Sequence, residues 1–396
     1  MKLFFELLKV SVGNAASLSA TPDAEAWREM LECAKRQALV GVCFAGIEAL
    51  PEGQRPDKAL LMEWYALTQQ IETRNRLLNE LSVKTCRYFE GNGFMACVLK
   101  GQGNAAMYPW PARRQSGDID VWVMPKAMST SEGDMTGGKP CRDVSIKHSR
   151  VEVLKWARTC FPDEDFDMKH IHFPIIKNVD MEVHFVPSQL RNLFANQRLI
   201  RYYEKTAQEQ MSHGVKLDGV DERLGLLTCP TSGFNMVLQL THIFNHFLSE
   251  GVGLRQVMDY YFLLLAAKEE CELADGPCIK EVLTEVRRLG LMGFLQALMW
   301  VMHEVLGMKE ECMVVPMDAK RGRVLLDEIL AGGNFGHYES RYWYSGMSRW
   351  KFYVARIRRM AHFLRYYPDE VLWDVPFRIW QRCWMAWMRA YSSLRT

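Results

Sequence analysis

The stretch Arg114-Gln-Ser-Gly-Asp-Ile-Asp-Val-Trp-Val123 decides the fold. Polar and apolar side chains alternate in its second half, which predicts a strand over residues 118–123 with one polar face and one packed face. Asp118 and Asp120 share the polar face of such a strand. Two like charges about 4 Å apart repel by roughly 4 kcal/mol at an effective dielectric near 20. A pair of this kind therefore favours a bound divalent cation.

A second strand further along the chain repeats this acidic arrangement. Residues 170–176 and 179–186 predict a hairpin, and its second strand places Asp180, Glu182 and His184 on one face. Three carboxylate oxygens that converge on one spot suit Mg²⁺, which takes its remaining ligands from water and substrate phosphates. The two acidic strands together predict a magnesium site.

A turn that contains glycine precedes the aspartate pair. Residues 94–99 form a short apolar run and predict a buried strand, followed by Lys100-Gly101-Gln102-Gly103-Asn104 at an expected helix start. Glycines there let main-chain N–H groups approach phosphate oxygens, and Arg114 could add a fixed positive charge. Either motif alone is weak evidence, since most such turns and aspartate pairs are structural. Their order along the chain is much more specific.

Four motifs together carry a family resemblance. They are the run Leu99–Pro109, the run Arg114–Val123, the triplet Glu182-Val-His184, and a helix with His242 and His246 followed by Leu254-Arg255-Gln-Val-Met-Asp259. Over about residues 90–270 this pattern resembles the bacterial uncharacterised nucleotidyltransferase family of the DNA polymerase β-like nucleotidyltransferase superfamily. The superfamily turn usually carries Gly-Ser or Gly-Gly, whereas this chain has Gly101-Gln102. The phosphate contacts must then come from the main chain, Lys100 or Arg114.

The resemblance implies both an activity and a set of site residues. The implied activity is Mg²⁺-dependent transfer of a nucleoside monophosphate from an NTP, expected to be ATP, to an unidentified hydroxyl acceptor with release of pyrophosphate. Asp118, Asp120 and Glu182 would be catalytic and hold two Mg²⁺ ions, with Glu182 also a candidate for deprotonating the acceptor. The nucleotide-binding residues would be Lys100, Gly101, Gln102, Gly103, Arg114, Ser116 and Arg255. The alternative is a catalytically degenerate module that binds a nucleotide or RNA in the same cleft.

Several residues near these motifs are secondary candidates. Asp180 competes with Glu182 as the third carboxylate, and His170 and His172 could join His184 if the hairpin register allows it. His242, His246 and Glu250 follow at i, i+4 and i+8, a spacing that is compatible with a metal but more often lines a cleft or a helix contact. Arg255 and Asp259, at i and i+4, could form an ion pair.

Strand patterns occur only between about residues 94 and 186, so the fold class is expected to be α+β. With the resemblance, this predicts a small mixed-sheet nucleotidyltransferase core flanked by N-terminal helices, one of them over about 57–90, and a large C-terminal helical region. A long mobile loop is expected at 125–148. The expected domains are 1–90 for the N-terminal helical segment, 91–190 for the core, 191–310 for a helical domain that completes the cleft, and 311–396 for a basic, aromatic-rich helical region.

The composition is that of a soluble globular protein, with 48% hydrophobic and 24% charged residues. It excludes a disordered chain, a collagen-like fibre and a coiled-coil rod. Eleven cysteines, an odd number without a CxxC motif, indicate neither a disulfide framework nor a thiolate zinc site. The N-terminal apolar stretch is too short for a secretory signal. We therefore expect a cytoplasmic protein.

The C-terminal residues differ in charge from the rest of the chain. From residue 341 onward the chain has 11 Lys and Arg but only three acids. This region therefore has a net charge near +8, although the whole chain has a net charge of only +2. Residues 376–391 have an amphipathic helical pattern with aromatic residues on one side and arginines on the other. The pattern fits contact with a membrane surface, contact with RNA, or an apolar stripe packed on the protein itself.

Overall fold

The structure, a computed structural model, describes residues 1–126, 145–161, 166–272, 279–334 and 348–393. Residues 127–144 of the expected loop lie outside these ranges. The α-helices are α1 (Lys2–Ser11), α2 (Ala24–Gln37), α3 (Val40–Ala49), α4 (Lys58–Gly91), α5 (Gln102–Ala105), α6 (Ile146–Cys160), α7 (Leu193–Gln210), α8 (Ser232–Ser249), α9 (Leu254–Glu272), α10 (Ile279–Arg288), α11 (Met292–Leu306), α12 (Ala319–Gly332), α13 (Arg349–Leu364), α14 (Pro368–Val371) and α15 (Asp374–Ser393). The strands are β1 (Phe94–Val98), β2 (Ile119–Pro125), β3 (His170–Ile176), β4 (Val179–His184), β5 (Gly214–Val215) and β6 (Leu227–Thr228).

Four strands form one mixed sheet in the order β1-β2-β4-β3. Strands β1 and β2 are antiparallel, β2 and β4 are parallel, and β3 and β4 are antiparallel. The hairpin between β3 and β4 turns at Lys177 and Asn178, whose φ angles of 51° and 60° are those of a two-residue hairpin turn. The α+β class and the small mixed sheet are confirmed.

The expectation that strands end near residue 186 was wrong. Strands β5 and β6 form a separate two-stranded antiparallel ribbon between α7 and α8. Each has only two residues, which is too short for an alternating pattern to be recognised in the sequence.

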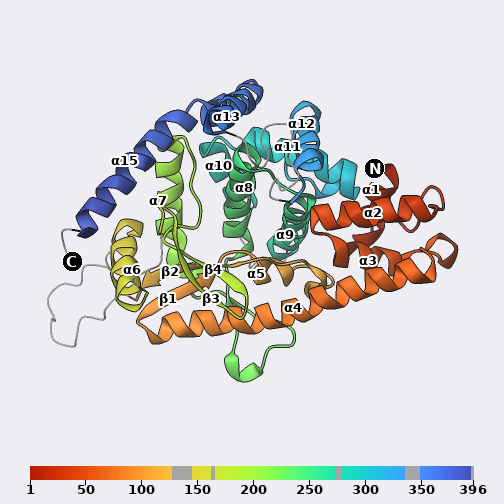
Figure 1. The fold of residues 1–396 in the computed structure, drawn as a ribbon, viewed down its shortest axis with the longest axis horizontal. Helices are drawn as coiled ribbons and strands as arrows, with labels where there is room; N and C mark the ends of the chain where they lie inside the picture. The colour runs from red at the N-terminus through yellow and green to blue at the C-terminus, as the bar shows by residue number, and fades with distance from the viewer. Residues whose placement is uncertain (127–144, 162–165, 273–278, 335–347, 394–396) are drawn as a thin grey trace.

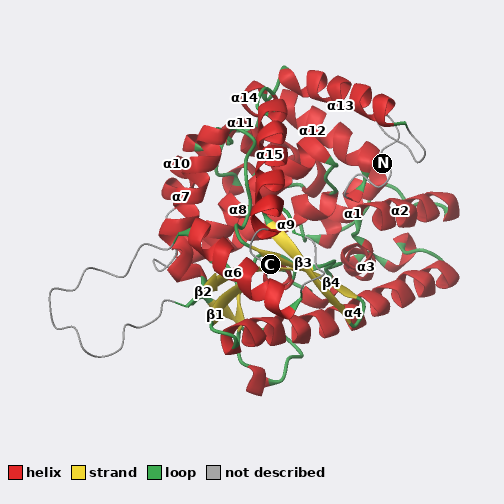
Figure 2. Cartoon of the chain, turned by 60° about the vertical axis from the view of Figure 1, so that its left-hand side comes forward, coloured by secondary structure: helices red, strands yellow, loops and turns green. Residues whose placement is uncertain are grey.

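Helices cover both faces of the mixed sheet (Figures 1 and 2). Helix α4 lies along one face, where Ile119, Val121 and Val123 of β2 are buried in a cluster with α4 and α6 side chains. On the opposite face Trp122 is fully buried. Its ring lies 6.0 Å from that of Phe234 in α8. The alternation in β2 therefore turns the aspartates toward the side of the sheet that α8 covers.

The N-terminal helices pack against helices from the far end of the chain. Figure 1 shows α1 to α3 beside α11 and α12, and all of them contribute to one large hydrophobic cluster. The Gln37 side chain donates to the Ile329 carbonyl at 3.1 Å and accepts from the Leu254 amide at 2.8 Å. The division of the chain into four domains stays a prediction.

Candidate active site

Three carboxylates meet where β2 and β4 run side by side. The parallel register pairs Asp120 with Glu182, so their side chains leave the same face of adjacent strands. Asp118, two residues before Asp120, extends from the same face just ahead of β2. One oxygen from each of the three carboxylates lies within 4.8 Å of the others. The structure thus brings together three acidic residues from two segments of the sequence that are about 60 residues apart.

Asp120 lies deepest in this group and has two cationic or hydrogen-bonding neighbours. Lys100 Nζ lies 2.9 Å from its Oδ2, and His184 Nε2 lies 2.7 Å from its Oδ1. Burial opposes ionisation of Asp120, but Lys100 and His184 outweigh it and hold the pKa of the carboxyl well below its ordinary value. Asp120 is therefore a carboxylate in the folded protein.

The other two carboxyl groups respond to their surroundings in opposite directions. His184 Nε2 lies 3.2 Å from Glu182 Oε2, and although burial acts against it, this hydrogen bond lowers the pKa of Glu182 to about 2. The charge of Asp120, and then the loss of solvent, raises the pKa of Asp118. The repulsion expected between paired aspartates therefore raises the pKa of Asp118 and not that of Asp120.

The hairpin register settles where the histidines lie. His170 pairs with His184, and His172 pairs with Glu182, so all four share the face of the acidic cluster. His170, Glu182 and His184 form a second group whose ligand atoms lie within 4.8 Å of one another. Among the described residues, Asp180 belongs to neither group and is exposed on β4.

A pocket opens beside the carboxylates, between the sheet and helices α8 and α9. Its walls include Lys100 and Gly101 from the turn after β1, and His242 from α8. Arg114, Arg255 and Asp259 line it as well. The pocket thus combines carboxylates that can hold cations with cationic side chains that can hold an anion.

A sequence model of a family described as uncharacterised nucleotidyltransferase matches residues 23–307. This chain belongs to that family. The match runs from the residue that caps α2 to the one that caps α11, so it extends well beyond the 90–270 region of the motifs. Searches of curated proteins and of solved structures gave no significant match.

Some residues of the glycine turn line the pocket, and others pack into the core. Gly101 has φ +55°, and the helix α5 that follows is only one turn long. The Gln102 side chain points away from the pocket to Asn79 of α4. A Cβ on Gly103 would lie 3.0 Å from the Cβ of Cys229, so that glycine permits close packing. Of the turn residues, Lys100, Gly101 and Asn104 line the pocket.

Replacing Gly101 with alanine is expected to destabilise the protein by about 1–3 kcal/mol, because an L-residue is strained at this φ. Thermal or denaturant unfolding measures the effect. Gly53→Ala is the matched control, because Gly53 lies in a short exposed turn with open space around it. Equal stability of the two variants would contradict the strain at Gly101.

Arg114 is engaged in a buried network. Its guanidinium donates to both oxygens of Asp259, at 2.6 and 2.7 Å, and to Ser116 Oγ at 2.9 Å. Tyr108 Oη also donates to Asp259, at 2.6 Å. Arg255 donates to the Gln115 carbonyl at 2.9 Å. Residues from three of the motifs, Tyr108, Arg114 and Asp259, therefore join the core to α9. The phosphate-binding roles of Arg114, Ser116 and Arg255 stay predictions.

Of the two α8 histidines, His242 lines the same pocket, and His246 lies one turn further along the helix. The rings of His242 and His246 lie 4.3 Å apart, and His246 Nδ1 lies 3.1 Å from Glu250 Oε2. Burial and then the charge of Lys100 hold the pKa of His242 well below its ordinary value. In the described part of the chain, neither histidine belongs to a group with ligand atoms close enough for a metal ion.

Neutral amides are the site residues that the sequence did not indicate. Asn104 Oδ1 accepts from Asn235 at 3.1 Å and from Gln239 at 2.8 Å, which fixes the turn against α8. Asn75 of α4 donates to the Ala112 and Arg114 carbonyls. Asn104 lies inside a motif, but Asn75, Asn235 and Gln239 follow no spacing that distinguishes them from other polar residues of amphipathic helices.

Proposed function

We propose that the protein transfers a nucleoside monophosphate from an NTP, with ATP the expected substrate, to a hydroxyl acceptor and releases pyrophosphate. The observation that carries this proposal is the convergence of Asp118, Asp120 and Glu182, of which Asp118 and Asp120 line a pocket together with Lys100 and Arg255. A like-charged trio is costly unless cations bind to it, so a site that only bound an anion would gain nothing from it.

The donor set supports Mg²⁺ as the cation. All three groups offer hard carboxylate oxygens within 4.8 Å of one another, and Mg²⁺ takes its further ligands from water and phosphates. Lys100 Nζ lies 2.9 Å from Asp120, so it supplies one positive charge where a cation would bind and can turn to a phosphate instead. Two bound ions would activate the acceptor hydroxyl and neutralise charge on the triphosphate.

The chain's own residues have distinct parts in this proposal. Lys100 and Arg255 provide positive charge for the phosphates, and the main chain at Gly101 lets a phosphate come close. His184 fixes the orientations of Asp120 and Glu182 by its contacts at 2.7 and 3.2 Å. The pKa of Glu182, about 2, means that its carboxylate holds a proton weakly. That value favours Glu182 as a cation ligand over a general base.

The test is transfer of label from each α-³²P-NTP in the presence of Mg²⁺, with cell extract as the source of acceptor. We expect Glu182→Gln to lower labelling at least about a hundredfold, since even partners outside the first ligand sphere cost 10- to 100-fold. Asp180→Asn is the matched control on the same strand face, and it should label as the wild type does. Equal loss in both variants would contradict the assignment of Glu182.

Binding of the same NTPs separates transfer from binding alone. Nucleotide binding that needs Mg²⁺ but yields no labelled product with any NTP would favour the alternative, a degenerate module that uses the same cleft. Labelling by the wild type that chelators abolish would support the transferase.

A further inference from the structure

Large apolar side chains gather on the outside of the C-terminal helices. Of the 18 large hydrophobic residues that are exposed in the described chain, nine lie between residues 350 and 387. They are Trp350, Tyr353, Ile357, Leu364, Leu372, Val375, Ile379, Trp380 and Trp387. Such a concentration of exposed apolar side chains points to an interaction site. Helices α13 and α15 that carry it lie at the outer edge of the molecule (Figure 1).

Helix α13 and its C-cap carry a regular pairing of apolar and basic residues. Trp350-Lys351, Ile357-Arg358 and Leu364-Arg365 repeat every seven residues, so each kind of side chain forms its own row along the helix. All six residues are exposed. The helix contains no acidic residue. Its outer side is therefore an apolar stripe bordered by a row of positive charge.

Helix α15 is apolar on both its inner and its outer sides. Phe377 is buried, and the half-buried Trp384 ring lies 5.0 Å from the Arg150 guanidinium of α6, so part of the aromatic stripe expected from the sequence does pack on the protein. The outer side nevertheless carries Val375, Ile379 and Trp387, each more than half exposed. The outer side of this helix is therefore apolar as well as basic.

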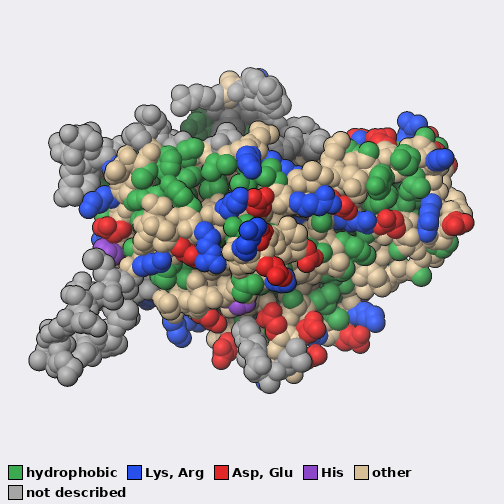
Figure 3. All heavy atoms as spheres, turned by 90° about the horizontal axis from the view of Figure 1, so that it is seen from below, with side chains coloured by type: hydrophobic (Ala, Val, Ile, Leu, Met, Phe, Trp, Pro, Cys, Tyr) green, Lys and Arg blue, Asp and Glu red, His purple; other side chains and the backbone are tan. Residues whose placement is uncertain are grey.

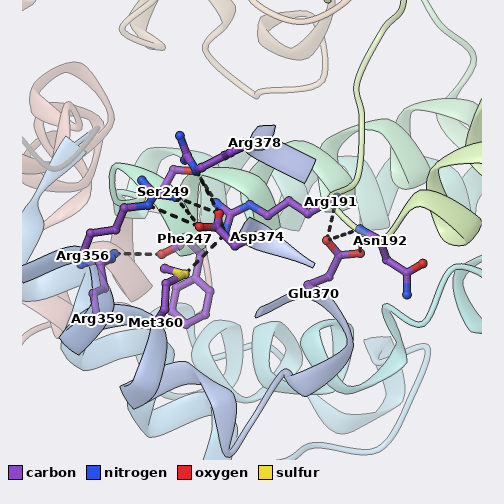
Figure 4. Close-up of polar contacts among 10 residues, drawn as sticks. All are labelled: Arg191, Asn192, Phe247, Ser249, Arg356, Arg359, Met360, Glu370, Asp374 and Arg378. Carbon is purple, nitrogen blue, oxygen red and sulfur yellow. Dashed lines mark hydrogen bonds and ion pairs between the residues drawn. The ribbon is translucent and has the colours of Figure 1, made fainter. Parts of the chain in front are cut away.

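Two of the three acids of this region, Glu370 and Asp374, are buried in contacts that hold its helices in place (Figure 4), and the third, Asp369, is exposed on α14. Asp374, which is buried, pairs with Arg191 at 3.0 Å, Arg356 at 2.8 Å and Arg378 at 3.3 Å. The buried Glu370 accepts from the Arg191 amide at 2.8 Å. Since these carboxylates face inward, the outward charge of α13 and α15 is positive.

The two stripes are neighbours on one surface. Arg382 of α15 donates to Tyr353 Oη of α13 at 3.5 Å, and both residues are exposed. The face over α4 differs, because positive and negative side chains are interspersed there (Figure 3), with i,i+4 pairs such as Arg76–Glu72 and Lys84–Glu80.

We propose that α13 and α15 dock the protein on the surface of an anionic lipid bilayer. Apolar side chains would enter the boundary of the acyl chains while Lys351, Arg358 and Arg365 contact lipid phosphates. No helix in the described ranges has the length and apolar character needed to cross a membrane. The contact is therefore one in which the helices lie in the plane of the interface.

Charge and side-chain type favour a bilayer over other occupants. In a symmetric dimer through this surface, the basic rows of two copies would face one another and repel. Single-stranded RNA would stack on the exposed rings of Trp350, Trp380 and Trp387. The likewise exposed Ile357, Leu364 and Ile379 offer no ring, and they fit an acyl boundary better. An anionic bilayer complements both the apolar stripes and the positive border.

The test is co-sedimentation of the full chain with vesicles of phosphatidylglycerol and phosphatidylcholine, and with vesicles of phosphatidylcholine alone. We expect binding to the anionic vesicles that weakens at high salt. Ile357→Glu with Ile379→Glu should lower the partition coefficient at least about tenfold, since it removes buried apolar area and adds repulsion. Met62→Glu with Leu226→Glu is the matched control, because these residues, 54% and 53% exposed, lie on other surfaces.

Each outcome supports or overturns the docking surface. Anionic binding that the control retains and the α13–α15 variant loses supports it. Failure of the wild type to sediment with anionic vesicles, or equal sedimentation of both variants, overturns it. A wild-type dimer in light scattering that Ile357→Glu with Ile379→Glu converts to a monomer would assign the surface to a second copy instead.

Discussion

Asp120→Asn is expected to lower nucleotidyl transfer by at least about 10²–10³-fold, the range found when one preorganised electrostatic contact is removed. Asparagine keeps the shape but removes the charge that would hold the cations. Asp120 is the carboxylate nearest to both Lys100 and His184, so its replacement disturbs the contacts that these two residues make with it. Labelling from α-³²P-NTP measures the loss, and Mn²⁺ binding followed by electron paramagnetic resonance shows whether it lies in cation affinity.

Thermal unfolding is the control for this variant. Loss of the Lys100 ion pair destabilises the fold, but removal of the charge that raises the pKa of Asp118 relieves a repulsion, so the two effects offset each other. The melting temperature should change little. Retained transfer would refute the active-site assignment, and a collapse of the melting temperature together with transfer would show that Asp120 is mainly structural.

Asp259→Ala is expected to lower the free energy of unfolding by about 3–5 kcal/mol, because it leaves a buried arginine without its counter-charge. Arg114 and Asp259 are each only 4% exposed in their side chains, and Tyr108 loses its acceptor as well. Denaturant unfolding measures the change. The double variant Arg114→Met with Asp259→Leu should recover part of the loss, since no unpaired charge remains. A double variant that is less stable than Asp259→Ala would contradict this reading.

The same pair predicts a pH dependence of stability. Burial opposes ionisation of Asp259, but Arg114 outweighs it and lowers the pKa of the carboxyl below its ordinary value. An unfolded aspartate has a pKa of about 3.9. The stabilisation is therefore complete above that pH and is lost as the pH falls through the lower folded-state pKa. Unfolding free energies of the wild type and of Asp259→Asn should converge in that acidic range.

The sequence was sufficient for the features that depend on local patterns. The alternation in residues 118–123 predicted strand β2 and its two faces, and the acidic residues of β4 predicted a second carboxylate strand. The expected helix over 57–90 is α4, with bounds within one residue. The hairpin register was left open, and the structure places His170 opposite His184.

Features that depend on long-range contacts could not be predicted. Arg114 and Asp259 are 145 residues apart. From the sequence, Arg255 was the expected partner of Asp259, because it lies only four residues away on the same helix. The direction of the Gln102 side chain toward α4 is likewise decided by tertiary packing. The outward apolar side of α15 was missed because the helical pattern groups Trp380 and Trp387 in one stripe with Phe377 and Trp384, whereas the structure leaves Trp380 and Trp387 exposed.

The bridge that Gln37 makes to Ile329 bears on how the protein matures during translation. The two residues are 292 positions apart, and at elongation rates of about 5–20 residues per second their synthesis is separated by roughly 15–60 s. During that interval the first three helices have left the ribosome, but α12, which later packs against them, has not yet been made. Chaperone capture of nascent chains should therefore be strongest before α12 has been made, and should fall once it leaves the exit tunnel.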